Sequence, residues 1–172
     1  MSQASDQMLW CLKKAERELA ECQREGKPAR HRGLIAGQPN RMLAQGHLRK
    51  AEHNLEAMLH NAKGGFTDWA VTAGFYAAYH CMLAILAAFG FESRNQTCTL
   101  AAIEALQEQG RIALDHRHIG MLRTGGRVIE MREAYTYGMQ CEASQDEVAA
   151  LRRTCLDILK SARGIVWSTL SR

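Results

Sequence analysis

Polar side chains that could contact a ligand gather within and just after one apolar stretch near the middle of the chain. Within the stretch, Tyr79 and His80 carry hydrogen-bonding tips among small and apolar neighbours. Where the apolar run ends, Arg94, Asn95 and Gln96 follow one another. Guanidinium and amide groups can contact phosphates or base edges, but they also satisfy free backbone groups at helix ends. The sequence leaves both interpretations open, and His80 could equally be a core histidine bonded to a neighbouring helix.

Motifs for several other chemistries are missing. His53 and His60 would share a helix, but seven positions span about 10 Å, too far for both to bind one zinc ion. The sequence holds no HExxH, no closely spaced cysteine pair and no GxSxG motif. The Gly125-Gly126 pair is not followed by the lysine of a phosphate-binding loop. We therefore expect no bound metal and no cofactor.

Helices are the elements expected to position these side chains. The core segment, residues 66–90, is apolar on nearly every side, which is typical of the central helix of a bundle. Thr, Tyr, His and Gly interrupt it too often for a membrane span, so no membrane contact is expected. Apolar residues at helical spacing predict further helices over residues 5–26, 41–62, 97–109, 118–139 and 144–166. The predicted fold is all-α, an up-and-down bundle of about five long helices plus one short helix.

The length of 172 residues fits a single domain in two parts. Residues 1–40 are predicted to hold an N-terminal helix and a flexible connector rich in Gly and Pro, and residues 41–172 the bundle. The net charge of +4 comes from a basic excess in the N-terminal third. This basic region could be a solvated face or a surface that steers a polyanion. The six cysteines lack a CxxC pair, and the N-terminus reads as a polar helix rather than a secretory leader. Free thiols and a cytoplasmic location are expected.

Two segments of the chain carry a distinctive pattern, FYAAYHCMLAILAAFGFESRNQTC at residues 75–98 and MREAYTYG at residues 131–138. Together they resemble the HEPN superfamily (higher eukaryotes and prokaryotes nucleotide-binding domains). The resemblance covers roughly residues 42–166, and the first 40 residues look like a variable extension. It implies a helical bundle that forms homodimers and binds RNA or a nucleotide in a toxin–antitoxin, defence or stress-response system.

The same resemblance points to the site residues. Many HEPN proteins cleave RNA without metal, using an arginine for the scissile phosphate and a histidine, four to six residues on, for the 2′-hydroxyl proton. At that place this chain has Arg132 followed by Tyr137, and tyrosine, with a pKa of about 10, is a poor general base at neutral pH. A second match, Arg111 with His116, lies one segment earlier.

The resemblance also places Tyr79 and His80 along the expected groove, with Arg94 and Asn95 as candidate RNA contacts. Three functions remain open. The chain could be a module that binds RNA or a nucleotide, a non-catalytic scaffold for an antitoxin or nucleotidyltransferase partner, or a metal-independent endoribonuclease. Whether the protein is an enzyme depends on what Arg132 faces.

Overall fold

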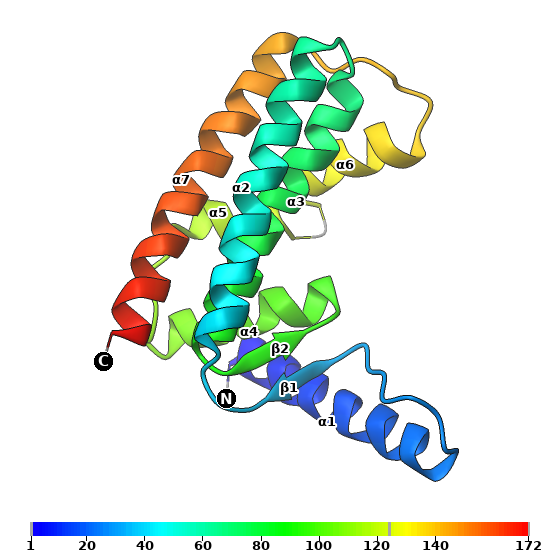
Figure 1. Ribbon diagram of the computed structural model, residues 1–172, viewed down its shortest axis with the longest axis vertical. Helices are drawn as coiled ribbons and strands as arrows, with labels where there is room; N and C mark the ends of the chain where they lie inside the picture. The colour runs from blue at the N-terminus through cyan, green and yellow to red at the C-terminus, as the bar shows by residue number, and fades with distance from the viewer. Residues whose placement is uncertain (1, 124, 172) are drawn as a thin grey trace.

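The computed structural model describes residues 2–123 and 125–171. Its helices and strands follow in the order α1 (Gln3–Arg24), β1 (Leu34–Ala36), α2 (Arg41–Lys63), α3 (Thr67–Ala88), β2 (Phe91–Ser93), α4 (Gln96–Glu108), α5 (His116–Met121), α6 (Arg127–Tyr137) and α7 (Gln145–Leu170). The long helices α2, α3 and α7 lie side by side, α6 lies beside α3, and α1, α4 and the two strands are gathered at one end (Figure 1). The predicted all-α fold is confirmed, since 73% of the structure is helical.

Helix α3 is the centre of the core, as its even apolar character predicts. It packs against α2, α7, α4 and α6, and most of its side chains are buried. Gly74 allows close packing, because a Cβ there would lie 2.9 Å from Cδ2 of Leu151 and 3.2 Å from Sδ of Met58. By length and composition α3 could cross a membrane, but 72% of its most apolar window is buried inside the bundle, as in a core helix.

The prediction of a single helix over residues 118–139 is wrong, because the chain forms two helices there. Helix α5 ends at Met121, and α6 begins at Arg127. Gly125 has φ +79°, a left-handed conformation that ends a helix, and a Cβ on Gly126 would overlap the carbonyl oxygen of Gly120. The two glycines therefore redirect the chain, and the turn sets the direction in which α6 crosses α3.

A short antiparallel pair of strands was not predicted. Leu34 lies opposite Ser93 and Ala36 opposite Phe91. The pairing continues past β1, where the Gly37 amide donates to the Gly90 carbonyl over 2.7 Å. Three-residue strands are too short to show an alternating pattern, and their partners are far apart in the sequence. The pairing orders part of the connector between α1 and α2.

Two of the six cysteines are not free thiols, which corrects the prediction from the sequence. Cys11 of α1 and Cys98 of α4 form a disulfide, with their Cα atoms 5.7 Å apart. Cys22, Cys81, Cys141 and Cys155 are free. The spacing of cysteines in the sequence could not reveal this pair, because only the docking of α1 on α4 brings the two residues together.

Candidate functional site: an arginine between two aromatic rings

Arg132 lies on α6, which is anchored to α3. Val128 and Ile129, in the first turn of α6, are buried in the core. Near the other end of the helix, the hydroxyl of Thr136 lies 2.8 Å from that of Thr72 on α3, within hydrogen-bonding distance. The two contacts bracket Arg132 and hold its backbone against α3.

The guanidinium group of Arg132 lies between two aromatic rings. Its central carbon is 4.7 Å from the centre of the Phe75 ring and 5.6 Å from the centre of the Tyr137 ring. Only 16% of the side chain is exposed. A guanidinium over an aromatic face gains roughly 0.5–2 kcal/mol and loses much of its rotational freedom. The charge is therefore held in one place before any ligand arrives.

The hydrogen-bond donors of this guanidinium have no acceptor in the described part of the chain. The Arg132 Nε atom is buried and unpartnered. The exposed carboxylate of Glu133 forms a loose ion pair with a terminal nitrogen at 3.8 Å, which is beyond hydrogen-bonding distance. Because a covered charge with unmade hydrogen bonds is costly, an acceptor from outside the chain would be well placed here.

Exposed aromatic side chains lie on α3 and α6, the two helices that hold the arginine site. Trp69, Thr72 and Tyr76 share one side of α3 because they are spaced by three and four residues, and Thr72 contacts α6. Trp69 is 59% exposed, Tyr76 42% and Tyr137 75%. We call Trp69, Tyr76 and Tyr137 the aromatic face. Large exposed rings beside a fixed cation are typical of a surface that stacks nucleobases or meets another protein.

The comparison with known families agrees with this geometry. A family model described as "HEPN domain" matches residues 44–166, which is more than half of the chain. The chain belongs to the HEPN family. No curated protein matches the sequence. Helix α1 and strand β1 lie outside the matched region, and HEPN domains are known for roles related to nucleotides and RNA.

Tyr79 of the HEPN domain hydrogen-bonds to Thr99, and its ring packs against the Phe75 ring on which Arg132 rests. Its ring stacks on Phe75 at 6.0 Å with an interplanar angle of 9°. Its hydroxyl lies 3.1 Å from the hydroxyl of Thr99, which donates to Ser93 over 2.8 Å. Burial raises the pKa of Tyr79, so the phenol stays neutral. Tyr79 therefore braces the Phe75 ring rather than facing a ligand.

His80 is paired with a second histidine. Its Nδ1 atom lies 3.0 Å from Nδ1 of His47 on α2, close enough for one neutral ring to donate to the other. Burial, with repulsion from His47 and Lys50, lowers the pKa of His80 to about 4, and burial also lowers the pKa of His47. Both rings are uncharged at neutral pH. This pairing gives His80 a role in fastening α2 to α3.

Arg94 and Asn95 lie at the opposite end of α3 from Arg132. From Phe75 to the end of α3 is about 20 Å along the helix axis. Arg94 is exposed and pairs with Glu92 at 3.1 Å. Asn95 caps α4, its side chain accepting from the Cys98 amide. The structure therefore does not bring these residues together with Arg132.

The two side chains of the second arginine–histidine match have different partners. Arg111 lies over the Phe89 ring at 4.8 Å, at the edge of a groove beside α7. His116, the first residue of α5, lies 3.3 Å from the Gln107 amide nitrogen in a different cleft. No hydrogen bond or contact recorded for the described residues joins the two side chains. They remain candidates from the sequence, but the structure gives them no shared site.

Phe75 is the site residue that the sequence did not single out. An apolar residue in an apolar helix gives no sign that its ring will carry a cation from α6. Among the described residues, no group of three or more His, Cys, Asp or Glu side chains could hold a metal ion. The arrangement at Arg132 can bind an anion and stack rings, but it places no histidine there to move a proton.

Proposed function

We propose that this HEPN protein binds single-stranded RNA, with Arg132 holding a backbone phosphate and the aromatic face stacking bases. The observation that carries the proposal is the covered guanidinium of Arg132, which contacts two rings and whose buried Nε atom has no hydrogen-bond partner. A phosphate offers several acceptor oxygens, which match the planar donors of arginine. Bases of single-stranded RNA stack on exposed rings at about 1–3 kcal/mol each. Binding in a toxin–antitoxin, defence or stress-response system is part of this proposal.

The proposal extends to a homodimer in which two copies of the aromatic face lie across one groove. The exposed rings of the aromatic face support contact between two copies, because Trp69, Tyr76 and Tyr137 leave apolar area in water that a second copy could cover. The second candidate is a scaffold in which a carboxylate from a partner protein, an antitoxin or a nucleotidyltransferase, accepts from Arg132. The same unpartnered donors support it.

Anisotropy of a fluorescein-labelled single-stranded RNA, titrated with purified protein at several salt concentrations, tests the main proposal. We expect Arg132→Ala to weaken binding about tenfold or more and to reduce the salt dependence by about one phosphate contact. Arg132→Lys should recover only part of the loss, because lysine keeps the charge but not the stacked fork of donors. The control is Arg24→Ala, which removes one exposed arginine at the end of α1.

Equal affinities for wild type, Arg132→Ala and Arg24→Ala would overturn the proposal. Incubation of the same RNA with the protein in EDTA separates binding from cleavage. Cleavage that survives Arg132→Ala would place the catalytic residues elsewhere in the chain. Cleavage that Arg132→Ala abolishes and Tyr137→Phe abolishes as well would establish the metal-independent endoribonuclease.

A further inference from the structure

The disulfide between Cys11 and Cys98 joins the N-terminal helix to the matched HEPN region. Cys98 lies in the first turn of α4, inside the matched HEPN region, whereas Cys11 lies on α1, outside it. The two positions are 87 residues apart, and neither side chain is exposed. The bond therefore fastens the N-terminal helix to the surface of the HEPN domain.

Apart from this bond, α1 packs through short side chains and two partly buried longer ones. Its buried side chains are those of Ala4, Cys11 and Ala15, and Met8 and Leu12 pack partly buried against the core, whereas the long helix α3 buries most of its length. The burial of alanines removes little apolar surface from water, so it contributes little to docking. At Gly33, the backbone just before β1 approaches α1 so closely that a Cβ would overlap the carbonyl oxygen of Cys11. The disulfide adds a covalent link between α1 and α4 to these contacts.

The two buried free cysteines are poor competitors for this chemistry. Burial raises the pKa of both Cys81 and Cys155 to about 12, which keeps these thiols protonated and unreactive. Cys141 is exposed and Cys22 partly so, and neither is bonded to another cysteine in the described chain. Cys11 and Cys98 are the pair that the fold aligns for reversible oxidation.

We infer that Cys11 and Cys98 form a redox-reversible pair that fastens α1 onto α4 when oxidised and releases it when reduced. In reduction, a thiolate of a dithiol attacks one sulfur and forms a mixed disulfide, and the other cysteine leaves as a thiolate that takes up a proton. The second thiol of the reductant then displaces the first cysteine. Two electrons and two protons reach Cys11 and Cys98, and the dithiol becomes a disulfide; a small-molecule disulfide such as oxidised glutathione reverses the reaction.

The burial of both sulfurs ties this exchange to the opening of α1. A thiolate cannot reach either sulfur until α1 moves away from α4, so the oxidised form resists attack until a local opening occurs. Once reduced, α1 keeps its non-covalent contacts, among them the packing of Met8 and Leu12 and the close approach of Gly33, but it loses its covalent bond to α4. Its opening therefore becomes much more frequent.

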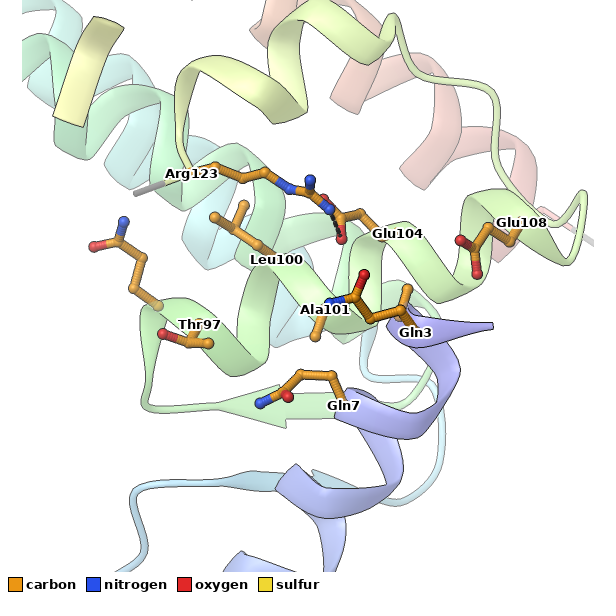
Figure 2. A pocket seen from close by; sticks show the side chains of 10 residues that line it. Gln3, Gln7, Thr97, Leu100, Ala101, Glu104, Glu108 and Arg123 are labelled. Carbon is orange, nitrogen blue, oxygen red and sulfur yellow. Dashed lines mark hydrogen bonds and ion pairs between the residues drawn. The ribbon is translucent and has the colours of Figure 1, made fainter. Parts of the chain in front are cut away.

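The release of α1 changes a cleft on the surface of the protein. Figure 2 shows this cleft, of about 360 Å³, with Gln3 and Gln7 of α1 facing Thr97 and Ala101 of α4. Ala101 is 5% exposed while α1 covers it. Departure of α1 removes one wall of the cleft and uncovers the face of α4 that carries Cys98. Oxidation state thus decides whether this face of the HEPN domain is open.

Hydrogen exchange followed by mass spectrometry, on full-length protein treated with oxidised glutathione or with dithiothreitol, tests the inference. We expect amides of residues 5–24 to exchange at least tenfold faster after reduction, while those of α2, α3 and α7 are unchanged. Cys11→Ser should show the fast exchange under both treatments. A Cys22→Ser, Cys141→Ser double variant is the matched control and should respond like wild type.

Thiol alkylation under denaturing conditions, read as mass, accompanies each sample. In the Cys22→Ser, Cys141→Ser double variant, the oxidised protein should lose two alkylation sites relative to the reduced protein, and peptide mapping should assign them to Cys11 and Cys98. Equal exchange of α1 in both redox states would overturn the inference. It would also fail if Cys11 and Cys98 stay alkylatable after oxidised glutathione, or if reduction accelerates exchange throughout α3.

Discussion

The guanidinium carbon of Arg132 lies 4.7 Å from the centre of the Phe75 ring, so a charge on α6 rests on a ring from the core helix. The ring of Tyr79 stacks on that of Phe75, and its hydroxyl hydrogen-bonds to Thr99 of α4. The position of the charge is therefore set by the packing of three helices rather than by α6 alone. A site built in this way is rigid, which lowers the entropy lost on binding.

Tyr137 should contribute through its ring and not through its hydroxyl. We expect Tyr137→Phe to bind single-stranded RNA like wild type, since the ring that covers Arg132 remains. Tyr137→Ala should weaken binding about three- to thirtyfold, because it removes both a stacking surface and one wall of the arginine site. Anisotropy titrations of the two variants measure the difference. A large loss in Tyr137→Phe would instead show that the hydroxyl contacts the ligand or moves a proton.

The aromatic face should prefer single-stranded over double-stranded RNA. Trp69→Ala and Tyr76→Ala are each expected to cost about 1–3 kcal/mol in binding of single-stranded RNA, because unpaired bases can stack on exposed rings. Binding of a duplex of the same length should change little. Trp167→Ala, which removes an exposed ring from α7, serves as the control. Equal losses in all three variants would refute a localised stacking surface.

Gly74 should be needed for the packing of α3. Gly74→Ala places a methyl group 2.9 Å from Leu151 Cδ2, so we expect a loss of about 1–3 kcal/mol in the free energy of unfolding. Gly164→Ala is the matched control in α7, where a Cβ would meet no atom within 4 Å. It should stabilise the helix by about 0.5–1 kcal/mol. Urea unfolding followed by circular dichroism measures both, and a stable Gly74→Ala protein would contradict the packing described.

The stability of the protein should fall as the pH drops from about 6.5 towards 4. The folded pKa of His80 is about 4, whereas a histidine of an unfolded chain titrates near 6.5. The unfolded state therefore takes up a proton that the folded state refuses, and stability is complete only above the unfolded pKa. We expect a loss of about 2 kcal/mol from His80, a figure reduced for its partial contact with solvent.

Urea unfolding at pH 7.0, 6.0 and 5.0 tests this expectation. His80→Gln removes the titrating ring while it keeps a group that can hydrogen-bond to His47, so its stability should vary less with pH. His53→Gln, which alters an exposed histidine of the same helix as His47, should keep the wild-type slope. A slope that is the same in His80→Gln and wild type would show that the histidine pair does not set the pH dependence.

Local sequence signals predicted the helices well, since they act within a few residues. The even apolar character of residues 67–88 identified the core helix, and a capping box of Ser144 and Glu147 begins α7 where the sequence predicted a helix start. Arg132 was singled out because the residues around it resemble the HEPN family. The match over residues 44–166 confirms that the chain belongs to this family. The break between α5 and α6 was visible as two glycines, but its geometry was not.

Tertiary structure alone decided which distant side chains meet. Phe75 and Arg132, His47 and His80, and Cys11 and Cys98 come from different helices, and no periodicity links one member of a pair to the other. The sequence by itself determined the helical architecture, the family and the arginine, because these depend on local preference and on ordered motifs. The structure decided that Arg132 contacts two rings while its Nε atom has no hydrogen-bond partner, that Arg94 lies far from it, and that α1 is tied to α4, because such contacts arise only when the helices pack.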